Sequence, residues 1–516
     1  MHKVLWTILL IVLMQDYCAQ NQIMPLNNQY GYELENTFYQ KSDHNVHSNI
    51  RPYLKKDYSK AGLSLAKDSI SVPVLPIRLE PLLIHKTIKK SSVNINPIIG
   101  AQLIQQTSET RLGYYGGVEV SANFPKKLGF YGWYRFAEEP NFNYLDSSGF
   151  IGDGINGVGR SVSTRSPNSG HHYEFYGTYN PNKYFEITAG RGSHFWGDGY
   201  RSLILSDNAA AYPFVRINSS FWNVKYTNLY AMHKDDTFGE RQNKYSTSHQ
   251  LSWNILRNLN FSVFESVIWS GQDSLISRGF DVNYLNPIIF YRPIEYLQGS
   301  SDNVLLGASL KYVIEEEHVF YSQFVLDEFL LSEIRAKRGW WANKYSLQIG
   351  YKGYNFLGIQ NLSVQGEWNM ARPFMYAHKT SLLNHGHEDQ SLAHPLGANF
   401  QEALGRIRYQ KDKWYFEAKV IYQDRGADFN SVSNGGNIFR SYTARNREYY
   451  HTIGQGEAHY VWHNELRVSY QFSFRSNLKA FVSYANRSDR SVGNVERLNL
   501  IRIGINSDLW NTYDDY

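Results

Sequence analysis

The chain has almost no cysteine. Cys18 is the only one among 516 residues, and it follows an apolar run from Val4 to Met14. That run is too short to span a membrane as a helix, and it is typical of a secretory signal peptide cleaved near Ala19-Gln20. We expect residues 1–20 to be a signal peptide, so the mature chain would have neither disulfides nor thiol chemistry.

The chain also lacks a concentrated charge of one sign. Its formal net charge is only +5, which argues against a nucleic-acid partner. The mean hydropathy is −0.47, a value that does not fit a helical membrane protein.

Catalytic signatures are missing too. No HExxH, GxSxG or P-loop pattern occurs, so we expect no enzymatic activity and no cofactor. A hydrolase would need two carboxylates at a set separation, which Glu186, Asp198 and Asp207 do not establish from sequence. One later segment holds several residues of types that bind metals: His378, His385, His387, Glu388, Asp389 and His394. Their spacing fits no standard zinc pattern, so we expect a solvated loop and no metal.

Aromatic residues, in contrast, are abundant: 40 Tyr, 28 Phe and 12 Trp. The segment 465–474 alternates strictly, with apolar residues on one face and polar residues on the other. A two-residue period is typical of a β-strand with one apolar face. That face would be the core of a soluble β-sandwich or would meet lipid in a membrane barrel, and alternation alone does not distinguish the two.

The lengths of the connections distinguish a membrane barrel from a soluble β-sandwich. Short connections are expected at 125–128, 180–183, 257–258, 315–317, 410–413 and 475–477. Long ones are expected at 138–170, 191–213, 234–247, 271–303, 330–344, 375–402 and 425–463. Short periplasmic turns alternating with long outer loops are typical of outer-membrane barrels.

The parity of these connections predicts the number of strands. Splitting 214–233 near Phe221-Trp222-Asn223 gives an all-β transmembrane antiparallel barrel of about 18 strands (16–18), with both termini periplasmic. The last strand is expected at 498–509. Residues 96–516 would form the barrel. Residues 21–95 would be a periplasmic arm or a lumen plug, irregular with one short helix near 32–39, or a partly disordered leader.

Residues 186–233 contain a glycine-punctuated loop with the sequence WGDGYRSLILSDNA. This sequence resembles that of the Wzi family of outer-membrane capsule-assembly proteins. It resembles more closely the Wzi-like proteins of Bacteroidetes, which include the gliding-motility protein RemB. Residues 286–303, 372–378 and 394–400 are similar to the same branch, whereas Asp198 stands where the enterobacterial proteins have a proline. The resemblance implies an outer-membrane barrel of eighteen strands with a short periplasmic N-terminal part.

The 192–213 loop supplies the candidate site. It would be a pore constriction, a glycan site in which Trp196 and Tyr200 stack on sugar rings, or a docking surface for a protein. Its apolar run at 203–205 predicts that it folds back into the barrel mouth. The candidate residues are His194, Trp196, Asp198, Tyr200, Arg201, Asp207 and Asn208.

The resemblance implies a function at the cell surface of a Gram-negative bacterium, in polysaccharide (capsule) association or in gliding motility. The partners would be outer-membrane lipid, surface polysaccharide, and motility or secretion machinery. Two other classes stay open: a diffusion porin for small solutes, which needs an open lumen, and a surface glycan hydrolase, which needs a converging pair of carboxylates.

Overall fold

The computed structural model describes most of the chain from residue 84 onward. The described residues are 26–28, 35–36, 38–39, 46–54, 84–88, 91–106, 109–124, 127–138, 154–155, 159–160, 169–237, 240–272, 278–287, 302–429, 432–473, 477–507 and 510–516. The signal peptide expected over 1–20 lies outside them. Residues 35–36 and 38–39 are helical, within the short helix expected near 32–39.

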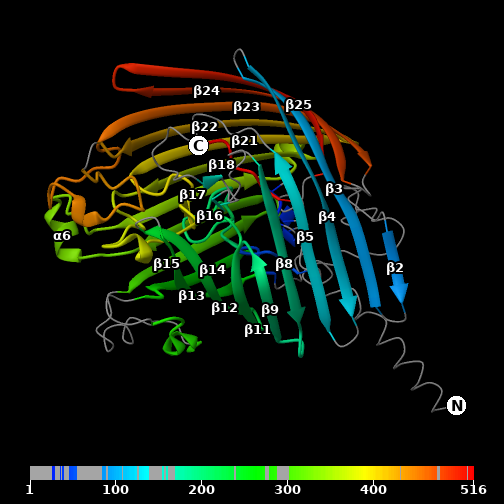
Figure 1. Cartoon of the computed structure of the whole chain (residues 1–516), viewed down its shortest axis with the longest axis horizontal. Helices are drawn as coiled ribbons and strands as arrows, with labels where there is room; N and C mark the ends of the chain where they lie inside the picture. The colour runs from blue at the N-terminus through cyan, green and yellow to red at the C-terminus, as the bar shows by residue number, and fades with distance from the viewer. Residues whose placement is uncertain are drawn as a thin grey trace.

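Within these residues, eighteen antiparallel strands close into one barrel (Figure 1). They are β3 (Ser91–Gln106), β4 (Glu109–Phe124), β5 (Leu128–Glu138), β8 (Ser169–Tyr179), β9 (Phe185–Gly192), β11 (Tyr212–Phe221), β12 (Val224–Thr237), β13 (Glu240–Leu256), β14 (Leu259–Ser270), β15 (Asn303–Ile314), β16 (His318–Leu326), β17 (Tyr345–Gly353), β18 (Leu362–Ala371), β21 (Phe400–Lys411), β22 (Trp414–Ala427), β23 (Glu457–Ser473), β24 (Leu478–Ser491) and β25 (Asn494–Asn506). The fold class and the count of eighteen are confirmed.

The barrel closes between its last and first strands. β25 pairs with β3 from Leu500↔Gln106 to Asn506↔Gly100, while the earlier part of β3 pairs with β2 (Ile84–Ile88). The sheet thus begins before residue 96, where the barrel was expected to start. Closure leaves the wall without free strand edges, as the membrane interior requires.

The structure also contains short elements that are not strands of the barrel wall. Those described are β1 (Ile50–Arg51), β6 (Gly154–Ile155), β7 (Gly159–Arg160), β10 (Phe195–Trp196), β19 (Gly386–His387), β20 (Gln390–Ser391), the 3₁₀ turns η1 (Val282–Leu285), η2 (Phe356–Gly358), η3 (Ser381–Leu383) and η4 (Tyr442–Ala444), and the helix α6 (Leu331–Ala336). Among the residues placed in the structure, no helix has the length and apolarity to cross a membrane.

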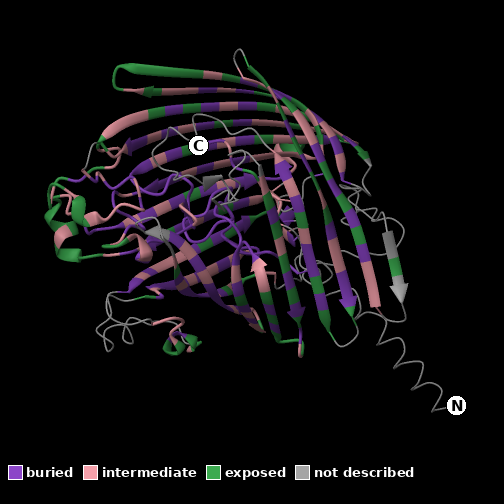
Figure 2. Cartoon of the chain, viewed as in Figure 1, coloured by how far each residue is buried: buried purple, intermediate pink, exposed green. Residues whose placement is uncertain are grey.

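The strands show the expected alternation of exposed and buried side chains (Figure 2). In β23, Leu466 and Phe472 are 60% and 51% exposed, whereas Ser469 and Gln471 are buried. Exposed apolar residues form the lipid-facing surface, and the polar ones face the lumen.

Most of the described connections sort by length as expected, but β24 and β25 are joined by a two-residue turn, 492–493, at the end that carries the long connections. The chain turns at 222–223 between β11 and β12, which confirms the predicted split there. The region 234–247 was wrongly predicted as a long loop, because β12 and β13 stay paired to Thr237↔Glu240. This ribbon is polar on both faces, so it lacks the alternation that reveals a membrane strand.

The C-terminus differs from the expected final strand over 498–509. β25 ends at Asn506, and Ser507 bonds both backbone groups of Ile99. The described tail, 510–516, then returns into the lumen, where Asp515 is 0% exposed and Tyr516 3%. Figure 1 marks this terminus within the outline of the barrel.

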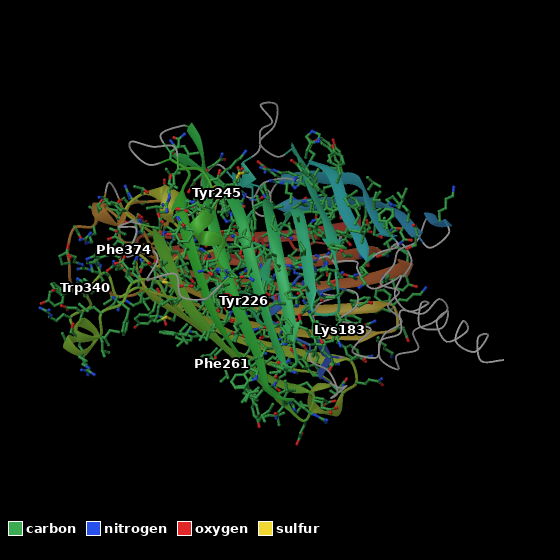
Figure 3. The ribbon with its side chains drawn as sticks, turned by 90° about the horizontal axis from the view of Figure 1, so that it is seen from below. Lys183, Tyr226, Tyr245, Phe261, Trp340 and Phe374 are labelled. Atoms are coloured by element: carbon green, nitrogen blue, oxygen red, sulfur yellow. The ribbon has the colours of Figure 1, made fainter. Side chains whose placement is uncertain are left out.

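We call the end of the barrel that carries the long connections, such as 327–344, the long-loop end. The opposite end, which carries the turn at 222–223, is the short-turn end. Trp340 and Phe374 lie toward the long-loop end, and Lys183 lies on a short turn toward the other (Figure 3). Exposed aromatic residues flank the short turns, as in an interfacial girdle, among them Tyr184, Phe221, Trp222 and Trp414.

The orientation can be tested by cysteine labelling. Ser332 and Thr443 are exposed at the long-loop end. Cysteine at either position is expected to react with an impermeant maleimide on intact cells, since long loops of such barrels face outward. Cysteine at Lys183 should react only after the outer membrane is ruptured. The reverse pattern would invert the topology.

Candidate functional site in the barrel lumen

The segment between β9 and β11, residues 193–211, lies inside the barrel. Its β10 strand pairs with β1 from the N-terminal region, Ile50↔Trp196 and Arg51↔Phe195. Trp196 is 0% exposed and meets Phe264 of β14 edge-on, with ring centroids 5.8 Å apart. The apolar run Leu203, Ile204 and Leu205 is also buried. These residues form a core within the lumen.

Polar side chains of the wall hold the backbone of this segment. Gln323 of β16 accepts a hydrogen bond from the Leu203 amide at 2.8 Å. Glu367 of β18 accepts from the amides of Tyr200 and Arg201 at 2.8 and 3.1 Å. A buried loop must find partners for its backbone groups, and here the strands supply them.

Two glycines make this close approach possible. A Cβ at Gly197, where φ is +154°, would lie 2.4 Å from Nε2 of Gln323. A Cβ at Gly199 would lie 2.4 Å from the Glu367 carboxylate. The WGDG pattern therefore brings the backbone close to the wall, and a side chain at either position would force Gln323 or Glu367 to move.

Arg201 is the centre of a buried charge cluster. Its guanidinium binds Glu402 of β21 at 3.2 Å and Asp515 of the C-terminal tail at 2.8 Å. His394 lies 2.9 Å from the same Glu402. Each of these side chains is at most 1% exposed. The cluster joins the loop, the wall and the tail.

A second branch of the cluster fixes the tail. Lys419 of β22 binds Asp515 at 2.7 Å and Glu465 at 3.0 Å, and the Tyr200 hydroxyl donates to Asp515 at 2.6 Å. Burial alone would raise the pKa of Asp515, but Arg201 and Lys419 hold that pKa well below its usual range. The carboxylate therefore stays charged and anchors the tail.

The two carboxylates of the predicted site are also engaged. Asp198 accepts from the Ser48 hydroxyl at 2.6 Å and lies 3.6 Å from the Lys311 ammonium. Asp207 accepts from Asn511 and from the Tyr513 hydroxyl, each at 2.7 Å. Burial raises the pKa of Asp207. Each carboxylate joins the loop to a terminal segment of the chain.

The two remaining predicted residues are packed as well. The His194 ring stacks on Tyr212 and meets Phe214 edge-on, with centroids 5.7 and 4.4 Å apart. The Asn208 amide donates to the Ser391 carbonyl at 3.3 Å. All seven predicted residues thus lie together in the lumen, between 0% and 9% exposed. Their burial is the arrangement expected of a constriction, and direct glycan contact stays a prediction.

Residues 193–211 form a plug in the lumen together with two further segments, 46–54 and 510–516. The sequence did not predict that these two segments meet the 193–211 loop. In the first, Arg51 donates to the carbonyls of Gly197 and Gly199 at 3.0 and 3.3 Å. The second is the tail, 510–516. The sequence carries one hint of it: two consecutive aspartates, Asp514 and Asp515, which do not continue a lipid-facing alternation.

The connection between β18 and β21, residues 372–399, packs on the plug from the long-loop end. The Tyr376 hydroxyl donates to the Leu203 carbonyl at 2.7 Å, and the Ser206 amide donates to the Leu392 carbonyl at 2.7 Å. His385 lies 2.9 Å from the Ile204 carbonyl. The loop that was expected to be solvated is therefore largely buried.

The histidines of this loop serve packing and hydrogen bonding. Burial lowers the pKa of His385 to about 4, and it lowers that of His387 to about 3. Both rings are neutral at pH 7 for that reason. In the part of the chain that the structure places, no group of three His, Cys, Asp or Glu could hold a metal ion.

These features define the class of protein: an outer-membrane β-barrel of eighteen strands, with a lumen occupied by its own chain. No family model matches the chain, and no curated protein sequence does so.

A solved structure does share the fold. Escherichia coli Wzi, an outer-membrane protein involved in group 1 capsule assembly and a carbohydrate-binding β-barrel, superposes with a TM-score of 0.57 at 13% identity, covering 94% of this chain and 98% of Wzi. Pseudomonas aeruginosa OccK8 (OprE) and OprD give TM-scores of 0.43 and 0.44 at 9% and 11% identity. They cover 80% and 85% of this chain and 97% and 98% of their own. The chain is thus Wzi-like in fold.

Proposed function

We propose that this barrel retains polysaccharide at the cell surface, as a non-enzymatic, plugged protein whose working face is its long-loop end. The observation that carries the proposal is the filled lumen, in which the Arg201–Asp515–Lys419 cluster joins the 193–211 loop, the C-terminal tail and the wall. A plugged barrel suits an anchored platform better than a path for solutes. The carbohydrate binding described for Wzi, a barrel of the same fold, supports the same role.

The long-loop end offers a surface suited to sugar rings. The connections 327–344 and 428–456 are joined there by backbone bonds from Trp341 to Glu448 at 3.1 Å and from Tyr450 to Arg338 at 2.8 Å. The guanidinium of Arg338 lies 4.3 Å from the centroid of the Tyr449 ring. Flat aromatic faces beside hydrogen-bond donors are the usual elements of a carbohydrate site.

Tyr450 is the strongest candidate for contact with glycan. It is 73% exposed, and its φ of +66° is held by the backbone pairing of the two connections. Tyr450→Ala is expected to weaken the binding of purified surface polysaccharide roughly fivefold, the effect of about 1 kcal/mol from one stacked ring. Binding to purified protein and retention on intact cells would both be measured.

A matched control is available at the opposite end. Trp222 is 93% exposed on a short turn, so Trp222→Ala removes a comparable ring without touching the proposed surface. Equal loss of binding in both variants, or none in either, would contradict this glycan site.

A second role, in gliding motility or secretion through a protein partner, is favoured by one feature. The helix α6 and its N-terminal flank expose apolar side chains at the long-loop end, Phe329, Leu330, Leu331 and Ile334. Exposed apolar clusters mark contact surfaces for proteins. Loss of motility in Leu331→Ser with unchanged polysaccharide binding would favour this role.

A further inference from the structure

The last strand of the barrel extends beyond the first. β25 pairs with β24 along its whole length, from Asn494 to Asn506. On its other side it pairs with β3 only from Leu500 to Asn506. Among the residues that the structure places, 494–499 therefore have a neighbouring strand on one side alone. We call this segment the β25 edge. Figure 1 shows the β24–β25 hairpin reaching past the tip of β3 toward the long-loop end.

The β25 edge lies beyond the lipid. Alternate residues of β25 face outward, and Ile503 and Ile501 on this face are 54% and 44% exposed. The next two residues on the same face, Asn499 and Arg497, are exposed and polar. A lipid-facing strand would continue with apolar residues. The change to polar residues places the boundary of the lipid near Ile501 and the β25 edge in water.

The backbone of the β25 edge offers hydrogen-bonding groups to a further strand. In an antiparallel pair, consecutive residues direct their N–H and C=O groups alternately to the two sides. The Ser507 amide donates to the Ile99 carbonyl of β3 at 3.0 Å, so the odd-numbered residues of β25 face the β3 side. Beyond the tip of β3, the groups of Val495, Arg497 and Asn499 meet no strand among the described residues. An unpaired row of this kind is a template for another strand.

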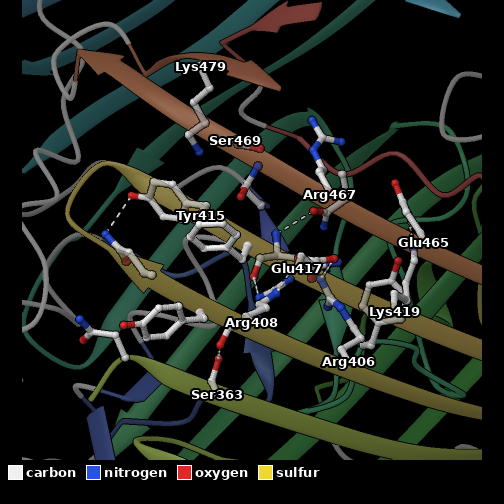
Figure 4. A pocket seen from close by; sticks show the side chains of 18 of the residues that line it. Ser363, Arg406, Arg408, Tyr415, Glu417, Lys419, Glu465, Arg467, Ser469 and Lys479 are labelled. Atoms are coloured by element: carbon white, nitrogen blue, oxygen red, sulfur yellow. Dashed lines mark hydrogen bonds and ion pairs between the residues drawn. The ribbon is translucent and has the colours of Figure 1, made fainter. Parts of the chain in front are cut away.

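Two charged side chains of the edge determine which strand fits. Glu496 and Arg497 are adjacent, so they lie on opposite faces of β25. Both are exposed, and neither forms an ion pair with a residue that the structure describes. Charges inside the barrel differ, because the chain itself matches them. In the cavity that Tyr200 lines, Glu417 lies 3.0 Å from Arg406, as Figure 4 shows.

A second copy of the chain fits this edge poorly. In an antiparallel pair of identical strands related by a twofold axis, the residue at the axis lies opposite itself. An axis at Arg497 opposes two arginines, and an axis at Glu496 opposes two glutamates. Like charges directly opposite each other destabilise a sheet. An axis farther along the edge leaves fewer residues paired, so the edge favours a different chain.

We propose that the β25 edge binds an extended segment of another protein as an added antiparallel strand. The segment carries an acidic residue opposite Arg497 and, next to it in its own chain, a basic residue opposite Glu496. Opposite charges facing each other across two strands stabilise the pair, and backbone hydrogen bonds hold the segment in register. The contact is small, so it suits a transient partner.

Disulfide capture by the purified protein in detergent measures this pairing. Asn494→Cys gives the edge an exposed thiol at a position where directly opposite Cα atoms are close enough for a disulfide. The matched probe is the synthetic peptide Thr-Val-Glu-Lys-Val-Cys, whose Glu lies opposite Arg497 when its Cys lies opposite residue 494. Mass spectrometry reads the captured fraction at equilibrium in a glutathione buffer.

Three further peptides are the controls. Thr-Val-Lys-Glu-Val-Cys has the same composition but opposes like charges, and its capture constant should be about tenfold lower. N-methylation of the matched peptide at its third and fifth residues removes the N–H groups that face the edge. This change should lower the constant about tenfold as well. N-methylation at the second and fourth residues, which face away, should leave it unchanged.

A variant of the protein should invert the preference. When Glu496→Arg and Arg497→Glu are combined, the peptide with Lys before Glu becomes the matched one and should be captured about tenfold better. Both side chains are exposed, so the exchange leaves the packing of the wall intact. Heat-modifiable gel migration reports whether the variant folds.

Several outcomes would overturn the proposal. Equal capture of the matched and charge-swapped peptides, or of the two N-methylated peptides, would mean that no strand pairs at this edge. An unchanged preference in the folded charge-exchanged variant would place binding elsewhere. Dimers of the unmodified protein that the matched peptide dissociates would assign the edge to a second copy. None of these outcomes bears on polysaccharide binding at Tyr450, so the two proposals fail independently.

Discussion

Replacing Arg201 with methionine is expected to lower the free energy of unfolding of the barrel by about 3–5 kcal/mol. The guanidinium lies between Glu402 and Asp515, and all three side chains are at most 1% exposed. Methionine fills similar space but leaves both carboxylates with less counter-charge in a site that water does not reach. Urea unfolding in detergent, followed by gel migration or intrinsic fluorescence, measures the change.

An exposed arginine provides the matched control. Arg111 of β4 pairs with Glu109 at 2.7 Å, but the two side chains are 32% and 64% exposed. Arg111→Met is expected to cost at most about 1 kcal/mol, because water screens such a pair. If Arg201→Met cost no more than Arg111→Met, the cluster would not hold the plug.

A double variant separates lost charge balance from lost packing. Glu402 also contacts His394, Asn369 and Gln423, so Glu402→Gln can keep hydrogen bonds while losing its charge. Combined with Arg201→Met, it should recover part of the lost stability. Additive losses would indicate that packing, rather than the stranded charge, dominates.

Removing the plug is expected to turn the barrel into a channel. Gly192 of β9 and Tyr212 of β11 are paired, so a short hairpin turn can replace residues 193–211 without moving the wall. Glu367→Gln and Glu402→Gln would accompany the change, since both carboxylates lose partners from the loop. β1 would also lose its partner, β10.

In planar bilayers this variant should show discrete conductance steps that the unmodified protein lacks, because an eighteen-strand barrel is wide enough for an aqueous channel. Gel migration and strand content by circular dichroism confirm that the wall is intact. A folded variant with no steps would mean that other segments close the lumen by themselves.

The sequence predicted the wall well because the wall obeys a local rule. Side chains of β23 such as Leu466 and Ser469 alternate between lipid and lumen, and alternation is visible in any short window. The strand boundary at 222–223 followed from the parity of the connections. The rule failed for 234–247, where a polar ribbon continues the sheet with no apolar face to reveal it.

The plug was harder to predict because its contacts are remote in sequence. The burial of Leu203 within the mouth followed from its apolar neighbours, and the structure places it there. The partners of Arg201 did not follow, since Glu402 and Asp515 lie on a different strand and in the tail. No periodicity links such residues, and only the closed barrel brings them together.

The conductance of the unmodified protein in a planar bilayer tests the central claim most directly. The wall has eighteen strands, but the lumen holds residues 46–54, 193–211 and 510–516. Residues 193–211 are joined to the tail by the buried Arg201–Asp515 ion pair and to residues 46–54 by hydrogen bonds. The predicted result is a barrel that inserts without stable conductance steps at moderate voltage. Regular, long-lived steps from the purified, folded protein would contradict a plugged lumen and would favour a diffusion porin instead.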